Sequence, residues 1–520
     1  MASDILSVPA SPPEPADPVP GRTAPDATSD ATRLLCAGAY LDREYRAAVI
    51  RVLTHPFRVV APSYGYDAVP VLAHALAARR LHRLRLAVLG AGLAGTVVLM
   101  VTGVLSGIVA LLTMLWLVWV TAFLQRVVTL QTLTNRLRAG TGAAGARDGF
   151  DGSYPDHPLL TARTVEKINH EQTADGSLIR YGGYKPFVGA GGQVRRWSTA
   201  ELLIGAPVNV LDQHRGGAGA PTAAGAQEPR RKEVVPFTGK EITDYVAGRM
   251  NAELRDRARR SERIGGLAVE QSAFTRAVTT IRPGGREPDR AHRGAGWAEG
   301  YDAQRVYLCV RVGSWNQELV TTAFVGFDLK GNTLHTEFYS YVLAPIRRSF
   351  HLVDRLPAAL NGPLLLRVAK DTLLATPGAA VGALFSWVPA VLAFLGRGDS
   401  RVRTNDPSEF RLGRYAVPAR NTGALTSVRE LATSADFHVF FQETDTIKYT
   451  QIVERQLLQF VRDFLQAHNV DLAEHEARQT NILNDYRHHN NHVENNHGNV
   501  NSGTQNVHHG SGGGKGAGAS

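Results

Sequence analysis

The feature that most constrains this chain is a stretch of 39 residues, Leu86 to Leu124, in which no side chain is charged. A single helix of this length would extend about 58 Å, roughly twice the thickness of the apolar core of a membrane. Two helices that each cross once fit that thickness much better. The small, flexible segment Thr102–Gly107 is where we expect the turn. The sequence therefore predicts a transmembrane hairpin over residues 86–125.

Arginines flank this stretch on both sides, and no Asp or Glu occurs between Asp67 and Asp148. Positively charged flanks are typical of the cytoplasmic side of a membrane protein. We therefore expect both ends of the hairpin, and with them the N- and C-terminal regions, to be cytoplasmic. The alternative is a helical pair buried in a soluble protein, which seldom runs so far without a polar face. The flanking residues are Arg79, Arg80, Arg83, Arg85, Arg126, Arg136, Arg138 and Arg147.

The segment Gly90–Gly95 matches the glycine spacing of a dinucleotide-binding loop. That fold also needs an acidic residue about 20 positions further on to bind the ribose. Here that region reads Ala110-Leu-Leu-Thr-Met-Leu-Trp116. Glycines at this spacing also let two membrane helices approach closely. We favour helix packing, with Trp116 and Trp119 near an interface or against the partner helix.

A second uncharged, apolar run covers residues 372–396 and contains Pro377 and Pro389. Basic residues lie on both sides of it, which conflicts with a single crossing. A kinked segment that dips into the membrane, or a helix that lies on its surface, would resolve the conflict. A third transmembrane segment is the alternative interpretation.

Composition places a limit on how much of the chain can lie in a membrane. The 520 residues are too many for one compact domain, and the hydrophobic fraction of 44% is ordinary for a globular protein. The net charge of +10 is concentrated beside the apolar segments, which favours lipid over nucleic acid as its partner. Only Cys36 and Cys309 are present, so we expect neither a disulfide framework nor a cysteine zinc site, but two semi-buried thiols.

The clearest β signal is a run of three segments, 305–312, 318–327 and 334–343, with a turn at 328–332. Consecutive strands of this kind predict an antiparallel meander. A charged helix is predicted over 240–263, and a short strand over 208–211. Residues 444–468 form an amphipathic helix whose wide apolar stripe is typical of a helix that closes a core.

Together these patterns predict a membrane-anchored α+β protein with a helical N-terminal region, the two-helix transmembrane hairpin, and a mixed cytoplasmic domain that contains the meander. The predicted parts are a disordered tail (1–30), helical region (31–85), hairpin (86–125), cytoplasmic α+β domain (126–371) with a Gly/Ala insertion (212–230), apolar segment (372–396), C-terminal part of the domain (397–483) and disordered tail (484–520).

The run Gly189-Ala-Gly-Gly192 could present backbone amides to an anion, with Arg195 and Arg196 close by. No Lys-Ser/Thr follows to complete a phosphate-binding loop. A simple glycine-rich turn is therefore the favoured interpretation.

The C-terminal tail is rich in Asn, Gly and His and cannot form a packed core. Disorder is our first interpretation. Its histidines (His488, His489, His492, His497, His508 and His509) could instead bind a transition metal without defined geometry. The segment Asn499–Val507 resembles the short Asn/Gln-Gly motifs with which some bacterial signalling proteins stack into amyloid-like assemblies.

Four stretches resemble an uncharacterised family of integral membrane proteins from actinomycete-type bacteria. They are Leu35–Arg43, Val60–Gly65, Tyr181–Gly189 and Tyr449–Val470. The resemblance covers most of the chain up to about Asn484. It implies a membrane protein, and because the family has no assigned activity it implies no catalytic residue.

Six polar residues are the candidates for an enzyme site: His157, His170, Glu171, Asp328, His335 and Glu337. None falls in a recognised motif, so we predict no catalytic, cofactor-binding or metal residue and no cofactor. We expect a membrane-anchored cytoplasmic binding, sensing or effector protein. The alternatives are a self-assembling channel or transport-related subunit and a membrane-tethered enzyme. The expected partners are the lipid bilayer and further copies of the chain, through the hairpin or the Asn-rich tail, and no nucleic acid.

Overall fold

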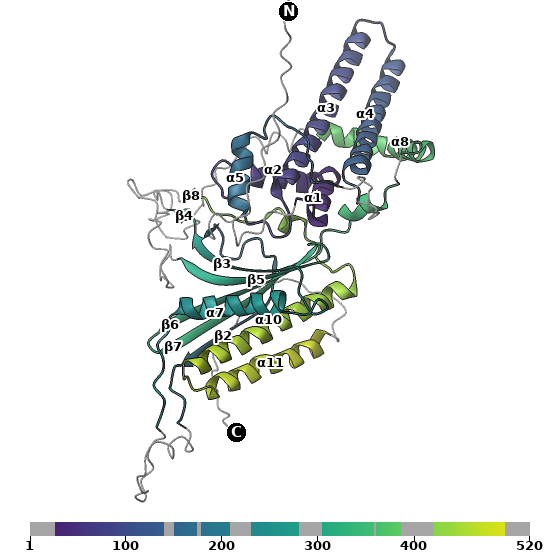
Figure 1. The fold of residues 1–520 in the computed structure, drawn as a ribbon. Helices are drawn as coiled ribbons and strands as arrows, with labels where there is room; N and C mark the ends of the chain where they lie inside the picture. The colour runs from purple at the N-terminus through teal and green to yellow at the C-terminus, as the bar shows by residue number, and fades with distance from the viewer. Residues whose placement is uncertain are drawn as a thin grey trace, which may run out of the picture. The chain divides into compact units, whose positions relative to one another are not determined.

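The computed structural model describes residues 27–139, 150–173, 178–208, 230–279, 304–357, 360–385 and 420–493. The chain divides into two compact units, Met1–Asp471 and Leu472–Ser520. The first contains a six-stranded sheet, a helical layer and a long helical hairpin (Figure 1). The second contains one described helix. The fold is therefore mixed α/β, as the sequence predicts.

The strands of the large sheet follow the order β1-β3-β5-β6-β7-β2. All neighbours are antiparallel except β1 and β3, which are parallel. The three consecutive strands β5, β6 and β7 confirm the predicted meander. The strands are β1 (Leu178–Tyr181), β2 (Gly192–Leu202), β3 (Leu267–Arg276), β5 (Arg305–Ser314), β6 (Leu319–Lys330) and β7 (Thr333–Leu343), with β4 (Val278–Thr279) and β8 (Arg420–Asn421) pairing separately.

The turn between β6 and β7 is tighter than the predicted segment 328–332. Only Gly331 and Asn332 lie between the strands, and both have positive φ, 53° and 61°. Two such residues make the hairpin turn whose twist matches that of the flanking strands, and Gly and Asn are the residues that adopt it most readily. The first residues of the predicted turn region, 328–330, therefore extend β6 instead.

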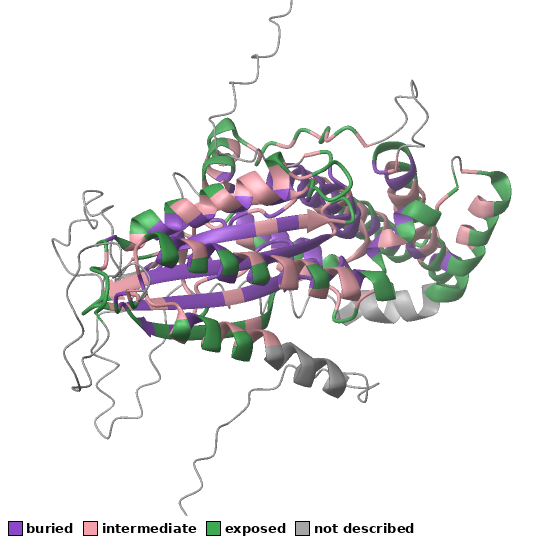
Figure 2. Cartoon of the chain, turned by 60° about the horizontal axis from the view of Figure 1, so that its bottom comes forward, coloured by how far each residue is buried: buried purple, intermediate pink, exposed green. Residues whose placement is uncertain are grey.

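Two helices cover one face of the sheet, α7 (Gly239–Asn251) and α10 (Phe440–Ala467) (Figures 1 and 2). The apolar stripe of α10 is buried, including Leu457, Phe460 and Phe464, so the predicted core-closing role is confirmed. Helix α7 passes into a short π-helical segment, η2 (Ala252–Asp256), and does not reach the predicted end at 263.

The opposite face of the sheet carries a cluster of aromatic side chains. Alternate residues of a strand point to opposite faces, which places Phe324 of β6 and Tyr341 of β7 on the side away from α10. The loop between β1 and β2 supplies Phe187, which stacks on Phe324 with ring centres 4.0 Å apart. Phe187 therefore closes this second core.

A helical layer forms a separate core from α1 (Asp30–Leu41), α2 (Arg43–Leu53), the start of α3 (Ala68–Val101), α5 (Ala162–Gln172) and the 3-10 helix η4 (Phe350–Arg355). Asp42 separates the first two helices, because its side chain accepts hydrogen bonds from the backbone of Glu44 and Tyr45. Gly38 is required in α1, since a Cβ there would lie 2.3 Å from the Phe350 ring. The predicted helices are present, and α5 is an addition that the sequence did not indicate.

The predicted hairpin is formed by α3 and α4 (Gly107–Arg136), which pack together along their lengths (Figure 1). Residues 102–106 connect them, and Gly103 has a positive φ of 74°. Helix α3 is continuous, so the end of the predicted helical region (31–85) and the first apolar segment are one element. A further helix, α8 (Gly362–Phe385), contacts α4.

Several predictions concern residues that lie partly or wholly outside the described ranges. These are the first tail (1–26), the Gly/Ala insertion with the strand at 208–211 (209–229), the end of the apolar run (386–396) and the last tail (494–520). The second unit contains α11 (Ala473–Val493), which begins with an Arg478–Glu474 ion pair of 2.6 Å. The helix extends past residue 484, where the sequence predicted disorder to begin.

Candidate functional site: the apolar hairpin and its connection to the sheet

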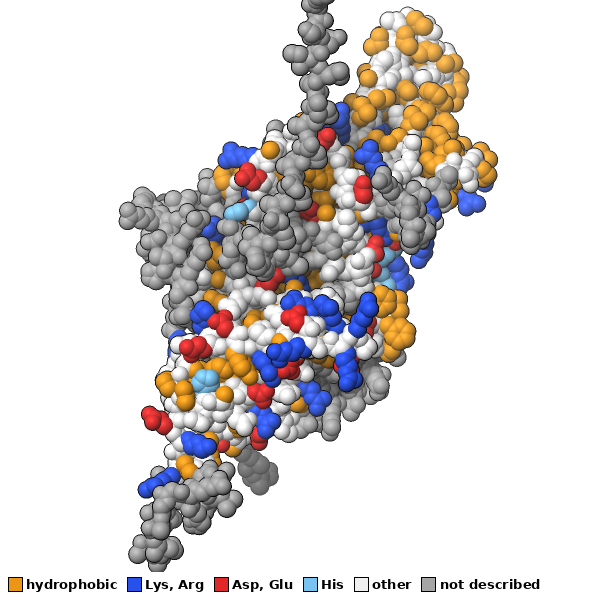
Figure 3. Space-filling model, viewed as in Figure 1, with side chains coloured by type: hydrophobic (Ala, Val, Ile, Leu, Met, Phe, Trp, Pro, Cys, Tyr) orange, Lys and Arg blue, Asp and Glu red, His pale blue; other side chains and the backbone are white. Residues whose placement is uncertain are grey.

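The hairpin of α3 and α4 exposes a large apolar surface. Val101 and Ile108, near its tip, are 80% and 76% exposed. Figure 3 shows hydrophobic side chains covering both helices up to the connecting turn. Both helices are long and apolar enough to cross a membrane. Soluble proteins rarely expose a contiguous apolar surface of this extent, and such surfaces are typical of contacts with a membrane or with another protein.

The glycines Gly90, Gly92 and Gly95 lie inside α3, not in a turn between a strand and a helix. A dinucleotide-binding loop is therefore excluded, because that site needs backbone amides at the start of a helix. Only Gly92 has a packing role within the chain, since a Cβ there would lie 3.0 Å from Leu117 of α4. Nothing lies within 4 Å of the corresponding positions at Gly90 and Gly95.

Helix α8 is attached to α4 near the foot of the hairpin. The indole nitrogen of Trp119 donates to the carbonyl oxygen of Ala369 over 3.1 Å, and Arg126 contacts the Thr372 hydroxyl at 3.0 Å. Trp119 thus bonds to α8, which is not the partner helix of the predicted hairpin. The second apolar run, predicted from residue 372, begins within α8, ten positions after the helix itself starts at Gly362.

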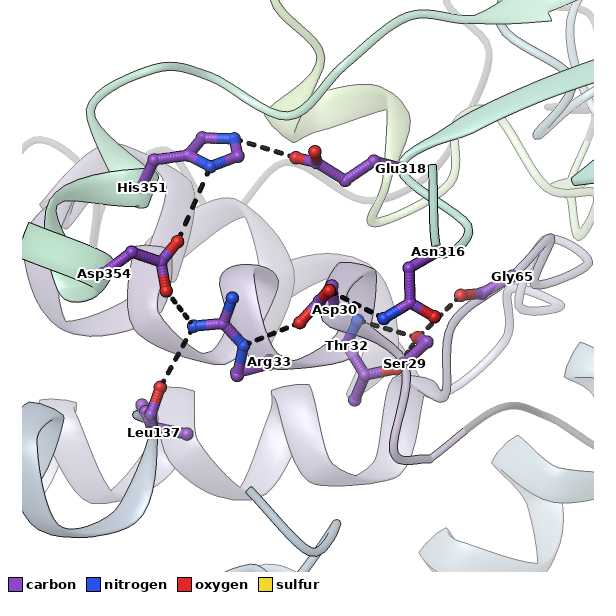
Figure 4. Close-up of polar contacts among 10 residues, drawn as sticks. All are labelled: Ser29, Asp30, Thr32, Arg33, Gly65, Leu137, Asn316, Glu318, His351 and Asp354. Atoms are coloured by element: carbon purple, nitrogen blue, oxygen red, sulfur yellow. Dashed lines mark hydrogen bonds and ion pairs between the residues drawn. The ribbon is translucent and has the colours of Figure 1, made fainter. Parts of the chain in front are cut away.

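Arg33 of α1 joins the hairpin to the rest of the first unit (Figure 4). Its side chain is 5% exposed and forms ion pairs with Asp30 at 3.0 Å and Asp354 at 2.5 Å. It also donates to the carbonyl oxygen of Leu137, where α4 ends, over 3.3 Å. A buried guanidinium with two carboxylates and a carbonyl has the partners that a buried charge requires.

The connection continues through His351 of η4. Its two ring nitrogens lie 3.8 Å from Asp354 and 2.8 Å from Glu318 (Figure 4). Contacts with Asp354 and Glu318 raise the pKa of His351 to about 9, so the imidazole is protonated at neutral pH. Glu318 lies in the turn between β5 and β6. The end of the hairpin is therefore connected to the sheet by an unbroken chain of charged groups.

That turn has an unusual backbone. Trp315, Asn316 and Gln317 all have positive φ, between 51° and 70°. Non-glycine residues adopt this conformation at a cost, and they do so where surrounding contacts fix it. Fully buried Arg429 provides such contacts by donating to the carbonyl oxygens of Gln317, over 2.7 Å, and Glu318. Burial lowers the pKa of Arg429 to about 10.

The predicted anion site at Gly189–Gly192 is present but is filled by the chain itself. The amides of Gly189 and Gly191 donate to one carboxylate oxygen of Glu430, over 2.9 and 3.1 Å. Arg195 forms an ion pair with Glu454 at 2.8 Å instead of serving this site. The loop is therefore a glycine-rich turn, as the sequence favoured, and its bonds to Glu430 fix the β1–β2 connection.

Three of the six polar candidates belong to α5 and the loop before it. His170 lines a shallow hollow beside α5, and His157 is in the loop, where its ring accepts a hydrogen bond from the Leu159 amide. Glu171 accepts a hydrogen bond from the Val60 amide over 2.8 Å, and burial raises the pKa of its carboxyl group. Glu171 thus fixes a loop next to the helical layer.

The other three lie on β6 and β7. His335 contacts Glu337 at 3.3 Å, and Glu337 accepts hydrogen bonds from Tyr307 at 3.0 Å and Tyr339 at 3.2 Å. Asp328 is paired in register with His335 and forms its ion pair, at 3.4 Å, with Lys330. The six candidates therefore form two separate groups.

Cys36 and Cys309 are free and buried, and burial raises the pKa of both, that of Cys309 to about 12. They are more buried than the sequence predicted. Among the described residues, no group of three His, Cys, Asp or Glu side chains is placed to hold a metal ion.

Comparison with known proteins gives one match. The profile of the AbeC-like domain family matches residues 196–508, which is more than half of the chain. The match begins within β2 and leaves out α3 and α4. No curated protein and no solved structure matches the chain.

Proposed function

The chain belongs to the AbeC-like domain family, and from this premise we propose that it is a membrane-anchored protein whose sheet-containing part acts in the cytoplasm. In this proposal α3 and α4 cross the bilayer and return, and the sheet domain is a binding, sensing or effector module. One observation carries the proposal. The exposed surface of the hairpin has no charge from Leu86 to Leu124, and arginines follow at both of its ends.

The lengths of the two apolar segments support this anchoring. Residues 86–101 of α3 rise about 24 Å and residues 107–124 of α4 about 27 Å at about 1.5 Å per residue. The hydrocarbon core of a bilayer is about 30 Å thick, and arginine side chains can extend to its surface. Arginines flank both apolar segments at the ends away from the hairpin tip. Membrane proteins keep such positive charge on the cytoplasmic side.

The distribution of polar groups supports binding over catalysis. The six candidates for an enzyme site are divided between α5 and the β6–β7 pair, and Glu171 and Glu337 serve structural hydrogen bonds there. An active site needs an acid, a base or a nucleophile that converge on one hollow. The arrangement therefore favours a domain that recognises a partner or a ligand through its surface.

Membrane fractionation tests the anchor. The full chain is expected in the membrane pellet after ultracentrifugation and to stay there after washing with alkaline carbonate. Leu115→Arg places a charge at the middle of the apolar part of α4 (107–124), which costs about 3 kcal/mol of insertion free energy, so the membrane fraction should fall. The matched control is Leu159→Arg, an exposed leucine outside the hairpin. Release of the unmodified chain by carbonate would contradict the proposal.

Cysteine labelling tests the orientation. Both native thiols are buried and should react slowly in the folded chain. In intact spheroplasts, a membrane-impermeant maleimide should label Thr102→Cys at the hairpin tip. It should label Ser261→Cys, which lies exposed after α7, only once the cells are lysed. Labelling of Ser261→Cys before lysis would exclude a cytoplasmic sheet domain.

A further inference from the structure

Two arginines lie together at the foot of the hairpin, one on each helix. Arg85 of α3 donates to the side-chain oxygen of Gln125 over 2.7 Å. Arg126, the next residue on α4, contacts the Thr372 hydroxyl of α8 at 3.0 Å. Three helices therefore hold the two guanidinium groups in place, although the partner side chains are neutral.

Negative charge is missing around this pair. Over the described ranges, neither Arg85 nor Arg126 has a carboxylate partner, and no Asp or Glu occurs in the sequence between Asp67 and Asp148. Burial and the positive charge of Arg126 lower the pKa of Arg85. The acidic residue next to Thr372, Asp371, is exposed. Two fixed guanidinium groups with no counter-charge favour an anion as their partner.

Positive charge extends from this pair toward α2. The pKa of His82, one turn before Arg85, is lowered by burial and by the charges of Arg43, Arg46 and Arg85. The charges that act on His82 from α2 and α3 are therefore those of arginines, and such positive charge attracts anions.

The depth of the pair matches the headgroup layer of a membrane. Arg85 and Arg126 are the first charged residues outside the two apolar segments, which are slightly shorter than the hydrocarbon core. Next to Thr372, Leu373 and Leu374 of α8 are exposed. The site thus combines two cations for a phosphate with an apolar surface for the acyl chains of the same molecule.

We propose that Arg85 and Arg126, oriented by Gln125 and Thr372, bind the phosphate of an anionic phospholipid. The guanidinium group matches a phosphate because its N–H groups can donate two parallel hydrogen bonds to it. The proposal deepens the proposed membrane anchoring and rests on it. It assigns the foot of the hairpin, and not the sheet domain, as the place where the chain distinguishes one lipid from another.

The test uses the full chain in mild detergent, titrated with phosphatidylglycerol or phosphatidylcholine and followed by native mass spectrometry. The unmodified chain should bind phosphatidylglycerol in clear preference to phosphatidylcholine. The double variant Arg85→Gln/Arg126→Gln should bind phosphatidylglycerol about 10-fold more weakly, with phosphatidylcholine unchanged. The control Arg259→Gln/Arg260→Gln removes the same charge from exposed positions after η2 and should keep the preference.

Thr372→Val keeps both charges and removes the hydroxyl that orients Arg126, so it should weaken phosphatidylglycerol binding several-fold even if the double variant fails to fold. A shift of the melting temperature by phosphatidylglycerol, and none by the same concentration of inorganic phosphate, would support a lipid as the ligand. Equal shifts by both would overturn the lipid assignment. A double variant that still prefers phosphatidylglycerol as strongly as the unmodified chain would also overturn the lipid assignment. Carbonate washing of the unmodified chain reports separately on the anchor.

Discussion

The guanidinium group of Arg33 donates a hydrogen bond to the carbonyl oxygen of Leu137 over 3.3 Å, although the two residues are 104 positions apart. Leu137 is the C-cap of α4 and directly follows its last residue, Arg136. The first described helix is therefore bonded directly to the end of the hairpin, and the same side chain also pairs with Asp354. This one arginine links three segments that are distant in sequence.

Replacing Arg33 should lower the free energy of unfolding. Arg33→Gln removes the cation from two carboxylates, Asp30 and Asp354, which are about one-third exposed. Loss of a fully buried partner costs roughly 3–5 kcal/mol, and the partial exposure of the carboxylates reduces this to about 2 kcal/mol of unfolding free energy. Denaturant titration of the detergent-solubilised chain measures it. The exposed Arg51→Gln on α2 should change stability by less than about 0.5 kcal/mol, and equal effects of the two variants would refute the role of Arg33.

His351 should make stability depend on pH in the alkaline range. Its folded-state pKa of about 9 lies above the ordinary value of 6.5, so its contribution is complete below pH 6.5. A shift of this size corresponds to about 3 kcal/mol, and the partial exposure of Asp354 reduces the loss between pH 6.5 and 9 to on the order of 1–2 kcal/mol. His351→Gln should flatten this loss, whereas His157→Gln, in the exposed loop, should leave it unchanged. A curve for His351→Gln that falls as steeply as that of the unmodified chain would show that another group is responsible.

Gly38 and Gly248 should respond to alanine in opposite directions. At Gly38 a methyl group would lie 2.3 Å from the Phe350 ring, so Gly38→Ala should destabilise the helical layer by about 1–3 kcal/mol. At Gly248, inside α7, nothing lies within 4 Å of the added atom. Alanine there should stabilise the chain by up to about 1 kcal/mol because it favours the helix. Melting temperatures of the two variants, measured side by side, test this prediction. Shifts in the same direction would contradict it.

Removing Glu430 should create a free anion site. Glu430→Ala leaves the amides of Gly189, Gly191 and Ser427 without their acceptor, at a cost of about 2 kcal/mol. Sulfate should then raise the melting temperature of this variant more than that of the unmodified chain, because it can occupy the vacated position. Glu262→Ala, at an exposed position, serves as the control. Identical sulfate responses would mean that the loop changes shape when the carboxylate is removed.

The parts of the fold that the sequence predicts well are those with a local pattern. The hairpin follows from a run without charge, the meander from alternating and β-branched strands, and α10 from its apolar stripe. Each of these patterns is set by residues that are close in sequence. Helix α5 has no such pattern, because it buries only Ile168 and Gln172, and the sequence therefore gave no indication of it.

The polar connection between the hairpin and the sheet could not be predicted in the same way. Its members come from α1, the β5–β6 turn and η4, and no spacing in the sequence relates Arg33 to His351 or Glu318. One signal was available. Arg33 directly precedes Leu34, Leu35 and an apolar run, a position at which an arginine that becomes buried requires carboxylate partners.

For the glycine-rich loop, the sequence predicts the chemistry of the site but not the group that occupies it. The sequence indicated that Gly189–Gly192 can present amides to an anion, which the structure bears out. It could not show that the anion is the side chain of Glu430, about 240 residues further along the chain. The chemistry of a site is often local, whereas the identity of its partner depends on the complete fold.

The continuity of α3 has a mechanical consequence. Its first half packs against α1 and α2, and its second half is one side of the apolar hairpin, with no break in the helix between them. Its proline, Pro70, lies in the first turn, where it is tolerated, and its glycines, Gly90, Gly92 and Gly95, lie beyond the part that packs against the helical layer. In the anchored state that we propose, a tilt at the foot of the hairpin, before Gly90, would therefore be transmitted to the helical layer. A change in bilayer thickness, which alters the tilt of such helices, would reach the interior of the protein through this single element.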